Sequence, residues 1–402
     1  MSASERRATA GLAAIFGLRM LGLFFIMPVF ALYADGLTGA TPTLIGLAIG
    51  AYGLTQALLQ IPMGMLSDRI GRRPVIFGGL AVFALGSVVA ALSTGIWGVI
   101  AGRALQGSGA IAAAVMALAA DHTRERQRTK AMAFIGVSVG LAFMLALIIA
   151  PSVAAAMGLS GLFWITAALA LGAMGLLHWL VPAPATRSHD RDIRAGTFTE
   201  VLRHPDLLRL DASVLLLHLI MTAQFVVLPV VIGEVVGLSP AAHWQVYVPV
   251  MMVSALLMFP AIGVGEAKRV MHRLVVVAVA LLIAGELALA DTIGVGPWAF
   301  VAALLVYFTA FNVLEASLPS LVSRFAPAHA RGAALGVFST AQFVGAFLGG
   351  VLGGATYGRF GAEGVFVASA ALAALWLVLV LGLQAPSVRN ADVCANQIAD
   401  NH

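Results

Sequence analysis

The segment GMLSDRIGRRP at residues 64–74 carries four charged residues, Asp68, Arg69, Arg72 and Arg73, in a chain where only 10% of the residues are charged. Apolar runs flank it on both sides, TLIGLAIGAYGLTQALLQIP before it and VIFGGLAVFALGSVVAALS after it. An α-helix needs about 20 apolar residues to cross the hydrocarbon layer of a membrane, and basic residues gather in short cytoplasmic loops. The pattern therefore predicts a short loop between two membrane-spanning helices.

The whole chain has the composition of a helical membrane protein. It has 402 residues, of which 61% are hydrophobic, and a mean hydropathy of +0.99, whereas soluble domains are about half apolar. The apolar residues form continuous blocks, unlike the alternating strands of a membrane barrel. The single cysteine, Cys394, excludes an internal disulfide and a thiolate metal cluster. We expect an all-α polytopic membrane protein without a cofactor or a metal.

Blocks bounded by Gly, Pro or charge predict twelve transmembrane helices in two sets of six. The first set falls at 11–34, 43–66, 74–94, 96–120, 130–154 and 160–181, and the second at 209–233, 241–262, 269–290, 297–322, 331–356 and 362–383. The predicted organisation is an N-terminal six-helix half at 1–181, a cytoplasmic linker at 182–208, a C-terminal six-helix half at 209–383 and a short cytoplasmic tail at 384–402.

The basic residues orient these spans. Nearly all of the 23 Lys and Arg residues fall in loops on one side of the twelve-helix arrangement. The exceptions are Arg359 on the other side and Arg19 and Arg103 within helices. Under the positive-inside rule this places both termini in the cytoplasm. The sequence pI near 9.9 is then a consequence of topology, and we expect no nucleic-acid partner.

The two halves resemble each other at corresponding positions. TKAMAFIGVSVGLAF (129–143) opens the fifth predicted helix after a basic loop, and RGAALGVFSTAQFVGAF (331–347) opens the eleventh in the same way. Paired six-helix repeats around a central site are typical of secondary transporters.

Two motifs carry a resemblance to a known family. Gly64, Asp68, Arg69, Gly71, Arg72 and Arg73 follow the pattern G-x-L-x-D-R-x-G-R-R and resemble the signature of the major facilitator superfamily. The fourth predicted helix adds RALQGSGAIAA (103–113), similar to the second signature of its proton-driven drug exporters, and the chain looks closest to the YajR branch of these antiporters. The fifth helix departs from the third signature, because Ala150 stands before Pro151 where the family has glycine, and this weakens the case for antiport.

The resemblance implies a conformational latch at residues 64–74. Asp68 is expected to accept hydrogen bonds at the start of the eleventh helix, near Arg331, where the helix dipole favours an anion. Arg72 is expected to pair with Asp121, and the two contacts together would hold an outward-open state. The alternative is that these arginines only set the topology, which would require neither Asp68 nor the glycine spacing.

Ionisable residues at membrane depth are costly and suggest function. Four lie near the predicted midplane, on the first helix of each three-helix repeat: Arg19, Arg103, His218 and Glu315. Arg19 has the alternative of extending to the cytoplasmic interface, and His218 that of a packing role. Glu315 is a candidate for proton exchange. Asn312 and Gln56 are further cavity candidates, with Tyr52, Gln60, Tyr307 and Gln342 as weaker ones, whereas Asp211 and Glu286 are interpreted as interfacial.

These features predict a monomeric secondary transporter in a bacterial inner membrane rather than an enzyme. No H-E-x-x-H, Walker or G-x-S-x-G motif is present. The predicted function is proton-coupled efflux of small amphipathic or lipophilic compounds. The alternatives are a proton-coupled symporter or a metabolite exporter of narrow specificity and, in another class, a membrane sensor that does not transport.

Overall fold

The computed structural model describes residues 1–402 apart from 182–198, 293–294, 328 and 384–402. Most of the predicted linker and the predicted tail therefore lie outside the described residues. Within the described ranges the structure is almost entirely helical, and one isolated bridge joins Thr38 to Gly95.

The helices follow the predicted blocks closely. Their bounds are α1 Ala3–Phe24, α2 Phe30–Ala34, α3 Pro42–Ile70, α4 Arg72–Leu92, α5 Ile96–Ser108, α6 Ala112–Asp121, α7 Glu125–Trp179, α9 Pro205–Val231, α10 Trp244–Ala267, α11 Met271–Asp291, α12 Pro297–Phe325 and α13 Arg331–Leu381, with a π-helix at Ile232–Val236 and a 3₁₀ turn at Pro240–Ala242.

Ten of the described segments are long and apolar enough to cross a membrane. Two of them, α7 and α13, are each bent at a glycine with a positive φ, Gly158 (66°) and Gly361 (67°). Glycine tolerates this backbone conformation because it lacks a Cβ. Each bend lies at a predicted boundary between two spans. When α7 and α13 are each counted as two spans, the ten segments give the twelve predicted transmembrane helices.

Two predicted helices are interrupted inside the bundle. The first predicted helix breaks after Phe24 and resumes as α2 at Phe30, with Pro28 in the break. The fourth breaks at Gly109 between α5 and α6, where the backbone leaves the helical region (φ −75°, ψ 50°). A break at membrane depth frees backbone groups that other parts of the protein must satisfy.

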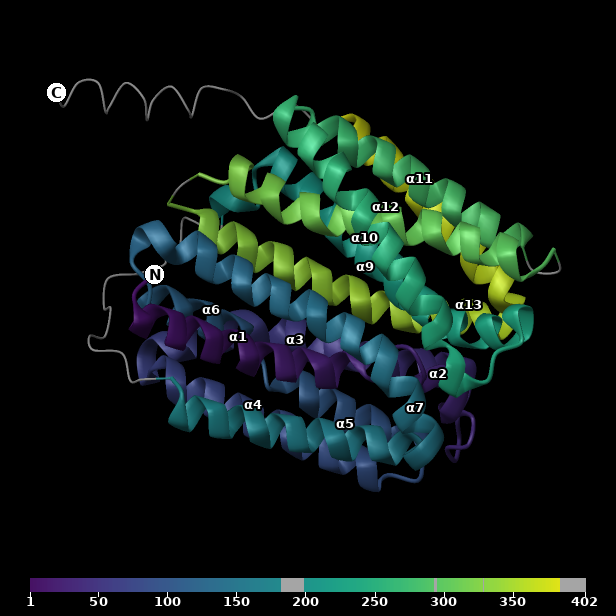
Figure 1. The fold of residues 1–402 in the computed structure, drawn as a ribbon, viewed down its shortest axis with the longest axis horizontal. Helices are drawn as coiled ribbons and strands as arrows, with labels where there is room; N and C mark the ends of the chain where they lie inside the picture. Colours follow the sequence, from purple (N-terminus) through teal and green to yellow (C-terminus); the bar gives the residue numbers. More distant parts are fainter. Residues whose placement is uncertain (182–198, 293–294, 328, 384–402) are drawn as a thin grey trace.

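The helices gather in two groups, α1–α7 and α9–α13, that lie side by side with their axes roughly aligned (Figure 1). We call the end of the bundle where α1 begins the near end, on the left in Figure 1, and the opposite end, where α3 begins, the far end. The turn at residues 64–74 lies at the near end.

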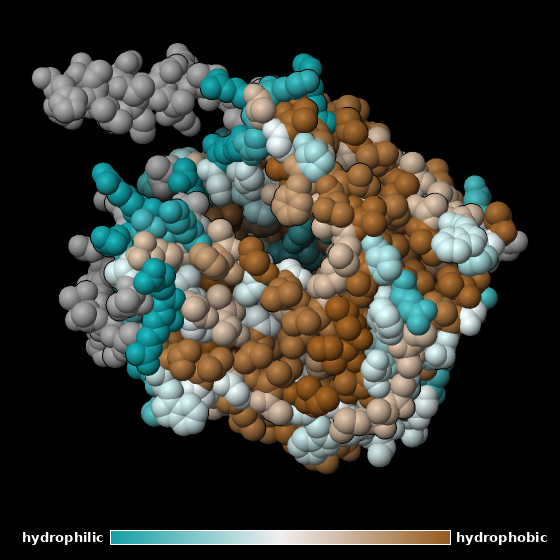
Figure 2. All heavy atoms as spheres, viewed as in Figure 1, coloured by the Kyte–Doolittle hydropathy of each residue, from teal (hydrophilic) through white to brown (hydrophobic). Residues whose placement is uncertain are grey.

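The surface of the bundle is apolar around its middle. Exposed large side chains include Leu58, Leu256 and Phe259, each at least 65% exposed. Figure 2 shows hydrophobic residues over most of one face, hydrophilic residues mainly toward the near end, and a hollow in the middle of the face with hydrophilic residues inside it. An apolar belt of this kind is expected where a helical bundle is surrounded by lipid.

Candidate functional site

Gly71 and Arg72 order the turn between α3 and α4. Gly71 ends α3 with a φ of 102°, which residues with a side chain rarely adopt. Arg72 forms an ion pair with Asp68, one helical turn earlier, and its Nη1 donates to Ser67 Oγ at 2.7 Å. Its Nε lies 3.6 Å from Oδ2 of Asp121 at the end of α6. The expected contact between Arg72 and Asp121 is therefore present.

The remaining members of the motif fasten this turn to its neighbours. A Cβ at Gly64 would lie 3.2 Å from the Cβ of Ala113, so α3 and α6 approach closely there. Arg73 Nη2 donates to the carbonyl oxygen of Leu177 on α7 at 2.9 Å. Arg69 is exposed. The motif thus connects α3, α4, α6 and α7 within the first group of helices.

Asp68 does not reach the start of α13 in this conformation. Its partner among the described residues is Arg72, and a Cβ at Gly332 or Gly336 would meet nothing within 4 Å. The near ends of α3 and α13 are open on these faces. The expected contact between Asp68 and the segment that begins at Arg331 is therefore not formed here, and it stays a prediction for a different conformation.

At the far end the same two helices touch through their backbones. A Cβ at Gly46 would lie 2.0 Å from the carbonyl oxygen of Gly350, and one at Gly50 would lie 2.6 Å from that of Phe347. A Cβ at Gly354 would likewise lie 3.1 Å from the Cα of Gly46. Small residues allow helices in a membrane to approach this closely. The far end is therefore closed between the two groups of helices.

Arg19 and Arg103 lie in one buried cluster, which we call the basic cluster. The Nη2 of Arg19 donates to Gln56 Oε1 at 2.8 Å and to the carbonyl oxygen of Gly109 at 3.1 Å, a carbonyl at the break between α5 and α6. The ring centroid of Tyr52 lies 5.7 Å from the Arg19 guanidinium and 5.2 Å from that of Arg103, within the range of a cation–π contact. Arg19 is only 1% exposed, so in this conformation it neither extends to the interface nor faces an open cavity.

Arg103 joins three helices of the same group. Its Nη1 donates to Gln106 Oε1 at 2.8 Å, and its Nε and Nη2 donate to the carbonyl oxygens of Ala48 and Ile49 on α3, each at 3.3 Å. Gln106 Nε2 in turn donates to Ser87 Oγ on α4 at 2.7 Å. These contacts hold α5 against α3 and α4. A guanidinium can satisfy several acceptors at once in this way because it carries five N–H donors.

The second group of helices holds a titratable cluster, which we call the carboxylate cluster. It consists of His218 on α9, Glu315 on α12 and Gln342 on α13. His218 Nε2 lies 3.6 Å from Glu315 Oε2 and 2.7 Å from Gln342 Nε2. His218 Nδ1 faces the carbonyl oxygen of Val214 at 3.2 Å. The Glu315 side chain is 41% exposed, whereas that of His218 is 8% exposed, so the carboxyl group is far more accessible than the imidazole.

The other predicted cavity residues are distributed between the two clusters. Asn312 Nδ2 donates to Ser254 Oγ on α10 at 2.8 Å, one helical turn from Glu315. Gln60 accepts a hydrogen bond from Gln56 at 3.1 Å and extends the basic cluster. Tyr307 is fully buried. The sequence therefore identified side chains from both groups, but it did not indicate which of them lie in contact.

Glu286 and Asp211, which were expected at the interface, are both buried among the helices of the bundle. Glu286 on α11 is fully buried and accepts a hydrogen bond from Gln224 on α9, and Asp211 is only 7% exposed. Distance from a helix end does not predict burial where neighbouring helices cover the position on all sides. Gln224, an amide within an apolar span, was the available signal and was overlooked.

A second feature missed from the sequence joins α1 to the start of α7. Glu5 Oε1 accepts from the backbone N–H and from Nε of Arg124 at 3.0 and 2.9 Å, and Glu5 Oε2 accepts from Nη2 at 3.1 Å. Ser2 and Glu5 also form a capping box at the start of α1. This near-end clamp lies entirely within the first group of helices.

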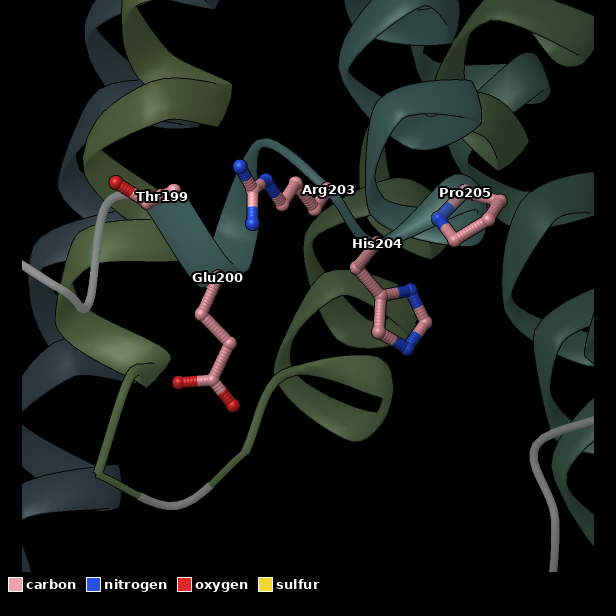
Figure 3. Close-up of a pocket in the computed structure, with 5 residues that line it drawn as sticks. All are labelled: Thr199, Glu200, Arg203, His204 and Pro205. Carbon is pink, nitrogen blue, oxygen red and sulfur yellow. The ribbon is translucent and has the colours of Figure 1, made fainter.

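One surface pocket lies away from both clusters. Its volume is about 610 Å³, and Thr199, Glu200, Arg203, His204 and Pro205 line it. Figure 3 shows Glu200 and His204 directed to the same side, below the short helical turn that precedes α9. Glu200 Oε2 lies 2.8 Å from Nε2 of His329, and both side chains are well exposed. The pocket thus lacks the buried polar groups found in the two clusters.

Comparison with known proteins agrees with this architecture. A family model described as the Major Facilitator Superfamily matches residues 12–350. The inner membrane transport protein YajR of Escherichia coli (strain K12) is 48% identical over 388 residues, which cover 96% of this chain and 85% of that protein. The multidrug resistance protein MdtH of Yersinia enterocolitica is 26% identical over 351 residues, covering 83% of this chain and 82% of that protein.

A solved structure shares the fold. A bacterial homolog of the human lysosomal transporter Spinster, in an inward-facing and occupied conformation, aligns with a TM-score of 0.77 at 14% identity and covers 97% of this chain and 98% of its own. The family model and the identity to YajR both extend over most of the chain. This protein therefore belongs to the Major Facilitator Superfamily and is a membrane transporter of that type.

Proposed function

We propose that this protein exports small amphipathic or lipophilic compounds from the cytoplasm of a bacterium in exchange for protons. It acts as a monomer in the inner membrane, with its N-terminal and C-terminal six-helix halves moving against each other and both termini cytoplasmic. In this orientation the near end is the cytoplasmic end, and the conformation described above is inward-facing. The name of MdtH as a multidrug resistance protein supports a drug-like cargo.

The observation that carries the proposal is the carboxylate cluster. Glu315 is partly exposed, and His218 lies beside it at 3.6 Å while also contacting Gln342. Burying a carboxyl group costs little free energy when it is protonated, whereas an ionised carboxylate must be stabilised by water or by a cation. A site whose proton affinity depends on which face is open couples proton movement to the conformational change.

The contacts of His218 suggest how the proton acts. With Nδ1 donating to the carbonyl of Val214, a neutral imidazole has a free acceptor at Nε2, which suits the amide N–H of Gln342 at 2.7 Å. A protonated imidazole has a donor at Nε2 instead. The protonated imidazole then donates to the Glu315 carboxylate on α12, and its hydrogen bond with the Gln342 amide on α13 breaks. Protonation of His218 thereby moves its bond from α13 to α12.

Glu315→Gln tests the coupling. The amide imitates the protonated acid permanently, so we expect proton-driven accumulation to be lost in proteoliposomes while energy-independent exchange of labelled substrate continues. Glu363→Gln is the matched control, because it removes an exposed carboxylate just after the bend of α13 at Gly361, and it should accumulate substrate normally. If Glu315→Gln still concentrates substrate under an imposed proton gradient, the coupling site lies elsewhere.

Orientation has a separate test. A reporter fused after residue 206 is expected to be cytoplasmic, and one inserted at residue 292 is expected to be external. A reversed result at either position would contradict the assignment of the near end to the cytoplasm. A panel of compounds for exchange assays can be chosen by testing the susceptibility of an efflux-deficient strain. If the wild-type protein exchanges none of them, the result would favour the alternative of a membrane sensor that does not transport.

A further inference from the structure

Glu286 is a buried acid that the proposed coupling through Glu315 does not use. It lies on α11 with no exposed surface, and Gln224 on α9, also fully buried, donates from Nε2 to its Oε2. The adjacent Gly285 packs against α12, since a Cβ there would lie 3.0 Å from the backbone of Tyr307. The acid is thus enclosed between three helices.

No cation in the described part of the chain compensates a charge on Glu286. Among the described residues, no Lys, Arg or His forms an ion pair or a hydrogen bond with it. Of the helices packed on α11, α12 presents Tyr307, a neutral phenol, and no charged side chain of the described α10 or α13 interacts with the acid. An unpaired carboxylate in such surroundings is so costly that the group takes up a proton instead.

Two oxygens of this pair, Glu286 Oε1 and Gln224 Oε1, are buried without a hydrogen-bond partner, and so is the hydroxyl of the neighbouring Tyr307. Two acceptor oxygens on paired side chains need a hydrogen between them, because a buried acceptor without a donor is costly. A carboxylic acid supplies it, since its O–H is a donor. With the proton on Glu286 Oε1, acid and amide each donate once and accept once.

We propose that Glu286 is a second proton-binding site of this transporter, at which a neutral carboxylic acid and the Gln224 amide form a pair with two hydrogen bonds that joins α9 to α11. The proton is added to Oε1 from water, and its loss would leave an unpaired buried charge facing the amide oxygen. Gln224 lies fewer than two helical turns from His218 on α9. The site therefore positions the helix that carries His218 of the carboxylate cluster, and it exists whether or not Glu315 couples transport.

Infrared spectroscopy of the purified wild-type protein at neutral pH tests the site. We expect a carboxylic acid C=O band that is absent in Glu286→Gln and that remains in Asp211→Asn, a control in which another buried acid is removed. Thermal stability should fall as the pH is raised above the range in which an exposed glutamic acid ionises, because the unfolded chain releases this proton while the folded protein keeps it. Glu286→Gln, which cannot ionise, should lose this part of the pH dependence.

Gln224→Leu tests the pairing independently of any failure of Glu286→Gln to fold. Removing the amide should leave the acid band in place but move it to higher wavenumber, because the C=O no longer accepts a hydrogen bond. A carboxylic acid C=O band that is unchanged in Glu286→Gln would show that Glu286 is ionised and would overturn the proposal. An unmoved band in Gln224→Leu would overturn the acid–amide pair. Neither readout depends on transport, so loss of the proposed coupling through Glu315 would not affect them.

Discussion

Helices α3 and α13 meet at the far end of the bundle and stand apart at the near end. At the far end the contact is backbone on backbone, through Gly46, Gly50 and Gly350. At the near end the same helices present the charged turn around Asp68 and the uncovered Gly332. A glycine contact offers close packing without adjustable side chains, whereas ion pairs in water are weak and easily rearranged. The far end therefore packs tightly, whereas the charged side chains at the near end can change their partners.

Gly350→Ala should disturb this contrast most. Its Cβ would lie 2.3 Å from the carbonyl oxygen of Gly46, so the helices must separate to accept it. Overpacking costs about 1–3 kcal/mol, which corresponds to a ~5- to ~150-fold shift away from the far-closed state. Spin labels at Asp35 and Arg359, in a Cys394→Ser background, should report a longer distance across the far end.

Gly336→Ala is the matched control on the same helix. A Cβ there would meet nothing within 4 Å, so the distance between the labels at Asp35 and Arg359 should stay as in the parent protein. Equal responses from the two alanine variants would show that the effect does not come from the close contact at the far end, and the contrast between the two ends would fail.

Asp68→Asn should have a smaller effect in the opposite direction. If Asp68 contacts the start of α13 when the near end closes, its charge contributes about 0.3–1 kcal/mol to that state. The variant should favour the near-open state and reduce transport, and labels at Arg69 and Arg331 should move apart on average. Full transport with an unchanged distance distribution would show that the turn only sets topology.

Combining Gly350→Ala with Asp68→Asn tests whether both ends share one equilibrium. The first change disfavours the far-closed state and the second favours it, so the double variant should return toward the parent distances at both ends. Positions this far apart are expected to act additively on a shared equilibrium. Independent responses at the two ends would indicate that they open separately.

Glu5→Gln should have the smallest effect. The clamp between Glu5 and Arg124 lies within the first group of helices, so breaking it should lower the melting temperature slightly without changing the label distances at either end. A clear shift of the distance between labels at Arg69 and Arg331 would contradict this and would make the clamp part of the near-end latch.

The span boundaries were predictable because their causes are local. A charged turn, a proline or a glycine interrupts an apolar run wherever it stands, and Gly158 and Gly361 lie at predicted boundaries because α7 and α13 bend there. Gly71 is predictable for the same reason. The charged residues around it already indicate a turn, and the turn requires a positive φ at this position. Partners were less predictable: the pairing of Arg72 with Asp121 came from a family resemblance and not from the residues alone.

The burial of Glu286 was not predictable in this way. The span that contains it is apolar on all sides, so periodicity does not indicate which face packs against another helix. Its position near a helix end suggested the interface, and the opposite result follows from the packing of α9 and α12 around it. A mid-span amide such as Gln224 is a useful signal for such sites, because an apolar helix rarely carries one without a partner.

By itself, the sequence determined that this chain is a bundle of membrane helices and where those helices turn. These properties depend on transfer from water to lipid, which each segment undergoes largely on its own. Tertiary structure alone decided that Arg19 and Arg103 bind amides and carbonyls, that His218 meets Glu315 and Gln342, and that the far end is closed. Arg19 and Gln56 are 37 positions apart in the chain, and His218 and Gln342 are 124 apart. Contacts of this kind exist only once helices that are all similarly apolar have packed in one particular arrangement.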